Sequence, residues 1–544
     1  MEERIRRAVG EAFKNVVIER PSNPAHGDYA MFIGLKAAEE VAKNIREKLG
    51  SAVASVEIAG SGFVNITLAP EAVTFAIAEA DAKKEEWGRV VSSPPVGGAE
   101  NRVLIEYTDP NPFKEMHIGH LMNNIIGESL ARLIENEGAK VMRANYQGDV
   151  GPHVAKALWG LQKAGTTEPT TAKEIGIAYT AGSLAYEESP EAKIEIDAIN
   201  REVYTGTNHE LMELWRRGRD VSLEAFEELY KILGAHFDYY FFESETAESG
   251  LRIVRDGIKQ GVFEESEGAI IYRGEKKGLH TLVFITSAGT PTYEAKDIGL
   301  AFLKEERVQS DRSLIMTASE QIGHFKVFLA ALSELAPKLA EKTTHIPHGF
   351  LRLASGKMSS REGNVITAES LIQDIIAKAS EKNADPLIAE QVALGAIKYM
   401  ILRQAPGSDI IFDPEKSLSL EGASGPYLQY ALVRANSIVA KALPTSEVGA
   451  PTKIVGGRIS EESYKIERLI VHYPEVVARS ARELAPNLLV NYLTELAGEW
   501  NSFYAQEKII GGEHEAHKLM IARAFVNTMT NGLTILGIPI PKRM

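Results

Sequence analysis

The 544-residue sequence contains no cysteine. Without a thiol the chain cannot form disulfides, bind zinc through thiolates or use a cysteine nucleophile. This absence removes several classes of enzyme and metalloprotein from consideration.

The sequence also lacks an apolar run long enough to span a membrane. Residues 1–17 (MEERIRRAVGEAFKNVV) are typical of an amphipathic helix and contain no signal-peptide core, so we expect a cytoplasmic protein without membrane contact. An excess of positive charge is missing as well, because the net charge is −14. Any contact with RNA would therefore have to use local basic patches.

One stretch, residues 111–133 (NPFKEMHIGHLMNNIIGESLARL), places two histidines where a strand-like run gives way to a helical pattern. Val103–Tyr107 predicts the strand, the apolar spacing from Leu121 to Ile134 predicts the helix, and residues 141–146 predict a second strand. A helix N-terminus in such a unit favours phosphate, and imidazoles can donate hydrogen bonds to it. The pattern indicates a nucleotide site, although surface histidines or half of a metal site remain alternatives.

The rest of the chain divides by composition. Residues 1–85 predict a mixed α/β segment ending in a strand near residues 58–68, and residues 87–101 form a linker. Residues 166–270 are helix-rich and are interpreted as an insertion, after which the strands AIIYR, TLVFIT and SLIMTA return. The simplest architecture is one parallel sheet whose two halves are separated by this insertion. From about residue 368 the patterns are helical, at 386–404, 420–442, 461–484, 486–508 and 515–536.

We therefore expect a multidomain α/β protein of roughly three or four domains. A Rossmann-like parallel-sheet catalytic domain with a helical insertion is preceded by a small α/β domain and followed by an α-helical bundle. The expected boundaries are 1–90 for the N-terminal domain, 100–370 for the catalytic domain with its insertion at about 166–270, 371–415 for a connecting helical segment and 416–544 for the bundle.

A second stretch, residues 349–364 (GFLRLASGKMSSREGN), brackets two cations and two hydroxyls with Gly356 and Gly363. This composition is typical of a loop that can close over a polyphosphate, and a charged surface turn is the alternative.

Together, H-I-G-H and K-M-S-x-R resemble the paired signatures of class I aminoacyl-tRNA synthetases. The segments EYTDPNPFKEMHIGH, NYQGDVG, LQYALVR, EWNSFY and NGLTILGIPIPKRM, with HGDYA and AGSGFVN near the N-terminus, are similar to arginyl-tRNA synthetases over nearly the whole chain. The resemblance implies ATP-dependent activation of L-arginine and its transfer to tRNA(Arg), by a monomer. It also implies Mg²⁺ as the companion of ATP, because the sequence offers no all-protein metal site.

The resemblance assigns the nucleotide-binding residues. His117 and His120 would stabilise charge on the ATP phosphates, Gly119 would allow close approach of the nucleotide, and Lys357, Met358 and Ser359 would contact ATP from the loop. This sequence departs from the general K-M-S-K-S loop, because Ser360 replaces the second lysine and Arg361 follows it. Lys114, Lys357 and Arg361 are the candidates for the catalytic cation, and a solvated surface cation is the alternative for each.

The arginine-binding residues implied are Glu106, Asn111, Tyr293, Asp297 and Gln321. A guanidinium needs carboxylates placed for forked hydrogen bonds, and the i, i+4 spacing puts Tyr293 and Asp297 on one helix face. The alternative for Asp297 is a solvated helix carboxylate. A second departure is Val150–His153 (VGPH), where many relatives have Trp-Gly-Thr-Gln.

For tRNA, Tyr427 and Tyr430 lie i, i+3 on a predicted helix, with Arg434 one turn further on. Core tyrosines are the alternative. The resemblance adds Met544 as an anticodon contact and Phe63 and Asn65 as contacts of the tRNA D-loop.

Three rival functions differ in what they require. A synthetase for another amino acid would need a different pocket around Glu106, Tyr293 and Asp297. A non-catalytic RNA-binding relative should have lost the histidines or the loop cations. A small-molecule nucleotidyltransferase would have no use for a large helical domain with RNA-facing aromatic residues.

Overall fold

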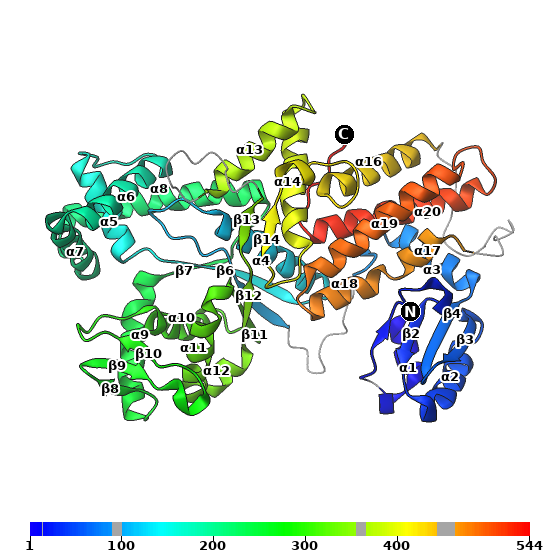
Figure 1. Ribbon diagram of the computed structural model, residues 1–544, viewed down its shortest axis with the longest axis horizontal. Coiled ribbons are helices and arrows are strands. Elements are labelled where there is room, and N and C mark those ends of the chain that lie inside the picture. The colour runs from blue at the N-terminus through cyan, green and yellow to red at the C-terminus, as the bar shows by residue number, and fades with distance from the viewer. Residues whose placement is uncertain (14, 90–100, 355–365, 443–462) are drawn as a thin grey trace. The chain divides into compact units, whose positions relative to one another are not determined.

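The computed structural model describes residues 1–13, 15–89, 101–354, 366–442 and 463–544 (Figure 1). Its contacts divide the chain into two compact units, Met1–Val90 with Ser419–Met544, and Val91–Leu418. No helix in the described ranges has the length and hydropathy needed to cross a bilayer.

A five-stranded parallel sheet forms the centre of the second unit. The strand order is β12-β11-β5-β6-β7, with β5 (Arg102–Glu106), β6 (Lys140–Gln147), β7 (Tyr239–Phe242), β11 (Arg312–Ala318) and β12 (Thr343–His348). β5 carries the run Val103-Leu104-Ile105, which is fully buried, as expected for a strand covered on both faces. The chain proceeds from β5 outward through β6 to β7, and then returns to β11 on the other side. The topological switch point therefore lies between β5 and β11, where open α/β sheets bind ligands at their carboxyl ends.

The helical segment between β6 and β7 consists of α5 (Pro152–Lys163), α6 (Ala172–Glu188), α7 (Pro190–Thr205) and α8 (His209–Leu233). The insertion predicted at about 166–270 is wrong in one respect, because β7 falls within that range and pairs with β6. The four aromatic residues of β7 follow Gly234, the left-handed C-cap that ends α8.

A separate antiparallel sheet is formed by β8 (Glu264–Ser266), β9 (Ala269–Tyr272) and β10 (Leu282–Ile285). The prediction that AIIYR and TLVFIT join the parallel sheet is therefore wrong, and only SLIMTA does so, as β11. The connection between β9 and β10 is too short for the crossover that parallel pairing requires.

Helix α10 (Tyr293–Arg307) packs very closely on α9 (Glu243–Lys259) through a glycine from each helix. A Cβ at Gly250 of α9 would lie 2.1 Å from the carbonyl oxygen of Ala295, and one at Gly299 of α10 would lie 2.4 Å from that of Thr246. These contacts fix the position of α10, which carries Tyr293 and Asp297.

The remaining elements of this unit are α4 (Ile118–Asn136), α11 (Ile322–Leu335), α12 (Pro337–Lys342), α13 (Ala368–Ser380), α14 (Pro386–Leu402), α15 (Pro414–Ser417) and the parallel pair β13 (Leu351–Leu353) and β14 (Ile410–Phe412). Among them, α13 lies at the top of the unit in the view of Figure 1, and α11 and α12 lie near α10 at its bottom.

The first unit joins the two ends of the chain. Its N-terminal part is an antiparallel sheet of order β1-β2-β4-β3 with three helices: β1 (Ile18–Glu19), β2 (Tyr29–Phe32), β3 (Val53–Ala59), β4 (Phe63–Leu68), α1 (Glu2–Val9), α2 (Leu35–Leu49) and α3 (Pro70–Lys83). The single strand predicted near 58–68 is wrong, because it comprises the end of β3, a turn and β4. Gly60 and Gly62 adopt positive φ in that turn, which a continuous strand would not tolerate.

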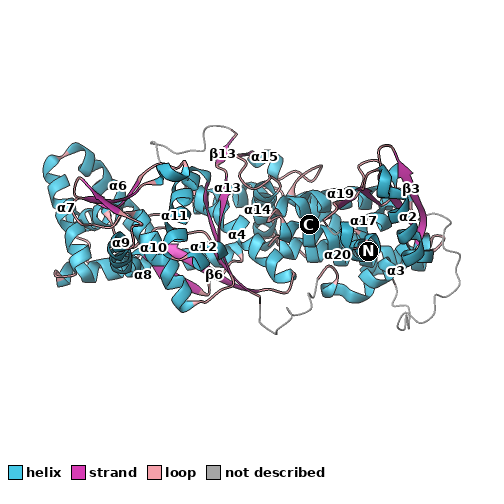
Figure 2. Ribbon diagram, turned by 90° about the horizontal axis from the view of Figure 1, so that it is seen from below, coloured by secondary structure: helices cyan, strands magenta, loops and turns pink. Residues whose placement is uncertain are grey.

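The C-terminal part of this unit is helical, as predicted (Figure 2). It contains α16 (Gly425–Lys441), α17 (Lys465–Val471), α18 (Tyr473–Arg482), α19 (Pro486–Gln506) and α20 (Glu515–Ile535). Helix α3 packs against α17 and α20, and the Arg523 guanidinium bonds both oxygens of Asp81 at 2.7 to 2.9 Å. The two ends of the chain thus share one compact unit.

The glycine contact between α9 and α10 predicts that Gly250→Ala destabilises the protein by about 2 kcal/mol, because the added methyl group must push backbone apart. The gain in helix propensity, about 1 kcal/mol, offsets only part of this cost. Urea unfolding of the variant beside Glu248→Ala, an exposed position on the same helix, measures the effect. A Gly250→Ala variant as stable as this control would contradict the packing account.

Candidate active site

Two histidines form a reciprocal cap at the N-terminus of α4. His117 is the N-cap residue, and its Nδ1 accepts the backbone N–H groups of Gly119 at 3.1 Å and His120 at 3.3 Å. In return, Nδ1 of His120 accepts the N–H of His117 at 3.3 Å. The two rings stack with centroids 3.7 Å apart. Imidazoles here take the role that Ser and Glu play in an ordinary capping box.

This cap determines which ring nitrogen carries the proton when each imidazole is neutral. Since each Nδ1 accepts a hydrogen bond, the proton of a neutral imidazole must be on Nε2. Burial, together with the charge of Lys114, lowers the pKa of His117. Burial, His117 and Lys114 hold the pKa of His120 well below its usual value. At neutral pH the helix N-terminus therefore presents two neutral Nε2–H donors.

Gly119 has a structural reason to lack a side chain. A Cβ at this position would lie 2.8 Å from Cε1 of the His117 ring, so any larger residue would displace the imidazole. The sequence predicted only that Gly119 admits a nucleotide. Glycine is also required at position 119 to keep the histidine cap intact.

The loop between β5 and α4 is held in an unusual conformation at the switch point. Thr108, Asp109 and Phe113 all have positive φ, which is costly for residues other than glycine. The Asn123 side chain accepts the N–H of Thr108 and donates to the carbonyl of Met316, both at 2.9 Å. Asn123 thereby joins the carboxyl ends of β5 and β11 and holds the strained loop in place.

The helix N-terminus is also tied to the chain that follows the second motif. Ala368 donates its N–H to the Met116 carbonyl at 2.7 Å, and Ile118 donates to the Ile366 carbonyl at 3.2 Å. The loop candidates Lys357, Met358, Ser359 and Arg361 lie outside the described residues. Lys114, the third candidate cation, is described, and its ammonium group lies 4.8 Å from the centroid of the Tyr179 ring.

Three carboxylates near the same edge of the sheet each have an internal cation. Glu106 pairs with Lys304 at 2.5 Å, Glu243 with Lys296 at 2.5 Å, and Asp297 with His324 at 2.7 Å. The first two pairs are almost fully buried, whereas Asp297 and His324 retain some exposure. An unpaired buried carboxylate would be very costly, so these cations are needed for the fold itself.

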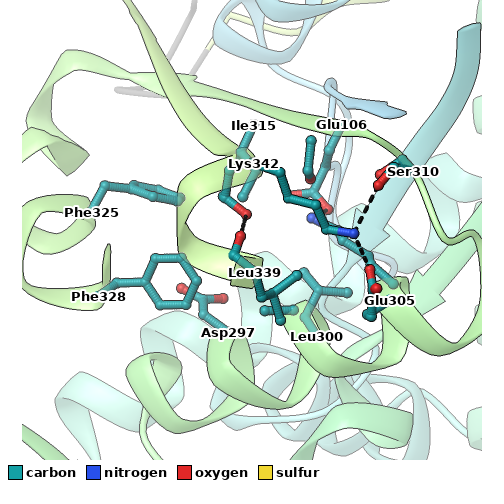
Figure 3. A pocket seen from close by; sticks show the side chains of 14 residues that line it. Glu106, Asp297, Leu300, Glu305, Ser310, Ile315, Phe325, Phe328, Leu339 and Lys342 are labelled. Atoms are coloured by element: carbon teal, nitrogen blue, oxygen red, sulfur yellow. Dashed lines mark hydrogen bonds and ion pairs between the residues drawn. The ribbon is translucent and has the colours of Figure 1, made fainter. Parts of the chain in front are cut away.

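Glu106 is thus placed differently from a residue that contacts substrate directly. Its side chain is buried against Lys304, and with Asp297 it lines a narrow cavity between α10, α11, α12 and the sheet (Figure 3). Burial and the charge of Glu106 raise the pKa of the neighbouring Asp109 well above its usual value.

The other predicted pocket residues lie around these pairs. Tyr293, at the start of α10, is 65% exposed, and the ammonium group of Lys296 lies 5.4 Å from its ring centroid. Asn111 accepts the N–H of Gly148 at 3.1 Å. Gln321 ends the short 3-10 turn Ser319–Gln321, one helical turn before His324.

The predicted tRNA-binding residues belong to the first unit. On α16, Tyr427 is half-buried and accepts a hydrogen bond from Asn501, whereas Tyr430 is exposed. The Arg434 guanidinium lies 4.1 Å from the ring centroid of Tyr504. Phe63 on β4 is exposed with its ring 5.2 Å from that of Phe32, and Asn65 and Met544 are half-buried.

Sequence reasoning missed several residues of this site. Asn123 interrupts an apolar run with a polar side chain, which is a readable signal of a buried hydrogen bond. No such signal in the sequence marks His324, Lys304 or Lys296, because no local pattern identifies their partners. In the described ranges, no group of three or more His, Asp or Glu side chains could hold a metal ion.

Three protein families match the chain. The family described as "tRNA synthetases class I (R), catalytic domain" matches residues 93–414, "Arginyl tRNA synthetase N terminal domain" matches 1–68 and "DALR anticodon binding domain" matches 428–544. An arginine–tRNA ligase of Treponema denticola is 31% identical over 97% of this chain and 94% of its own length. The corresponding ligase of Flavobacterium psychrophilum is 30% identical over 89% of this chain and 85% of its own length.

Solved structures agree with this result. The arginyl-tRNA synthetase of Thermus thermophilus superposes with a TM-score of 0.80 at 25% identity, covering 100% of this chain and 99% of its own. The arginyl-tRNA synthetase of Plasmodium falciparum shares the fold, with a TM-score of 0.77 at 18% identity, covering 100% of this chain and 97% of its own.

His153 generates a pH prediction. Burial and the charge of Lys114 lower its pKa to about 3, and its Nε2 lies 2.8 Å from the carbonyl oxygen of Gly148. A histidine kept neutral by folding contributes stability above its unfolded pKa and loses it as the pH falls. Between about pH 6.5 and pH 5 this residue should destabilise the fold by up to about 2 kcal/mol.

Urea unfolding at about pH 7 and pH 5, on either side of the unfolded histidine pKa, tests this. His153→Gln keeps an N–H donor for Gly148 but cannot take up a proton, so it should lose less stability than the wild type on acidification. Equal losses in the two proteins would contradict the role of His153.

Proposed function

Because the chain belongs to the class I arginyl-tRNA synthetases, enzymes that use ATP to join arginine to tRNA(Arg), we propose that the described site carries both half-reactions. In the first, the arginine carboxylate attacks the α-phosphorus of ATP and pyrophosphate leaves. In the second, a hydroxyl of the terminal tRNA ribose attacks the activated carbonyl and AMP leaves. The observation that supports this placement best is the histidine cap, which lies at the same sheet edge as the paired carboxylates.

His117 and His120 bind the phosphates in this proposal. Their Nε2–H groups donate hydrogen bonds to oxygens on which charge develops as pyrophosphate leaves, and the dipole of α4 favours negative charge at the same place. Neutral donors are suited to this task, because two stacked imidazolium ions would repel each other. Gly119 keeps the cap intact and leaves room for the nucleotide.

Arginine occupies the carboxylate side of the site. Asp297 receives the guanidinium, the exposed ring of Tyr293 packs against it, and Gln321 and Asn111 supply further polar contacts. Glu106 has an indirect role in arginine binding, because its carboxylate is buried against Lys304. A compact ammonium would match this arrangement less well than a planar guanidinium.

Lys114, Lys357 and Arg361 are proposed to offset the charge of the polyphosphate, with Met358 and Ser359 contributing contacts from the loop. Mg²⁺ is proposed to arrive with ATP. Among the described residues, no group of three or more His, Asp or Glu side chains could hold the ion, which agrees with a metal bound mainly through the nucleotide.

The tRNA contacts are proposed for the first unit. Tyr430 and the stacked pair of Arg434 and Tyr504 offer a ring and a cation for unpaired bases, with Tyr427 and Met544 also in the matched anticodon domain or at its edge. Phe63 and Asn65 on β4 are proposed for the D-loop. We further propose a monomer that acts in the cytoplasm, where its tRNA is found.

ATP–pyrophosphate exchange tests the pocket. The wild type should exchange with arginine and with no other amino acid, in the presence of tRNA(Arg). Asp297→Ala should raise the KM for arginine at least about 100-fold while the KM for ATP changes little, because an ionic partner of the guanidinium is lost. An unchanged arginine KM in this variant would overturn the pocket assignment.

A further inference from the structure

Asp297 does not stand alone in the site, because His324 from α11 reaches across to it. The Nε2 atom of His324 lies 2.7 Å from Oδ2 of Asp297, and its Nδ1 lies 3.4 Å from Oε1 of Glu294. One imidazole therefore links two carboxylates of α10.

The ring of His324 is held in place by aromatic neighbours. Phe325 packs edge-on at 5.2 Å and Phe328 lies parallel at 6.5 Å, measured between ring centroids. Phe325 itself stacks on His345 at 4.0 Å, and Nε2 of His345 lies 2.8 Å from the Thr317 hydroxyl at the end of β11. The imidazole is thus anchored to the sheet through Phe325 and His345, and it cannot turn away from Asp297 without disturbing this cluster.

We propose that His324 is a positioning residue for arginine selection, which holds Oδ2 of Asp297 by a hydrogen bond so that the rest of the carboxylate faces the guanidinium. This inference rests on the proposed role of Asp297. A carboxylate has about four lone-pair sites, so the bond to His324 leaves acceptor capacity for the substrate. Without it, the side chain could rotate or turn towards another cation.

The charge state of His324 supports this role. Burial acts to lower its pKa, but the hydrogen bonds to Asp297 and Glu294 and the charges of these two carboxylates raise it to about 10. Both ring nitrogens therefore carry protons at neutral pH. The ring can donate to Asp297 and Glu294 at the same time.

Two substitutions separate positioning from packing. His324→Phe keeps an aromatic ring between its neighbours but removes the donor, whereas His324→Gln keeps a donor near the place of Nε2 but removes the ring. Positioning predicts that the phenylalanine variant raises the KM for arginine roughly 10- to 100-fold, and that the glutamine variant recovers most of this loss. The KM for ATP should stay close to the wild-type value in both, and Lys326→Ala, an exposed position on the same helix, is the matched control.

The test is ATP–pyrophosphate exchange in the presence of tRNA, with the Asp297→Ala variant measured under the same conditions. If Asp297→Ala raises the arginine KM but His324→Phe does not, the positioning role is overturned while the pocket stands. A glutamine variant more impaired than the phenylalanine variant would also overturn it, because packing alone would then explain the residue. If Asp297→Ala leaves the arginine KM unchanged, the proposed pocket itself fails.

Discussion

The reciprocal cap between His117 and His120 is the interaction on which the rest of the site depends. It satisfies N–H groups at the start of α4 and fixes the tautomer of both rings, while burial and the charge of Lys114 lower the pKa of each ring. The same bonds that begin the helix therefore orient the two donors that we propose bind phosphate. Helix formation and the proposed phosphate binding thus require the same ring orientation.

The charges of the site also serve the fold and the proposed function together. An enzyme that selects a cationic amino acid needs carboxylates, yet an unpaired buried carboxylate would destabilise the fold. The structure meets both needs by giving Glu106, Glu243 and Asp297 a cation each. Of the three pairs, the one at Asp297 retains the most exposure, which agrees with its proposed role as the arginine contact.

The sequence predicted the elements around the first motif well, because β5, α4 and β6 are specified by local patterns of apolar residues. The prediction for β9 and β10 was wrong, because periodicity does not identify the partner of a strand. The contact between Asp297 and His324 joins two helices, and no local pattern marks it. The ion pair of Glu106 with Lys304 was missed for the same reason, while the roles of Lys357 and Arg361 stay predictions because those residues lie outside the described ranges.

The most direct test of the account is the protonation state of the two capping histidines, measured by ¹⁵N NMR of imidazole-labelled protein with His117→Gln and His120→Gln for assignment. Both rings should remain neutral, with the proton on Nε2, from about pH 6.5 to 8, because burial lowers their pKa values. A ring that carries its proton on Nδ1, or that is charged at neutral pH, would contradict the reciprocal cap.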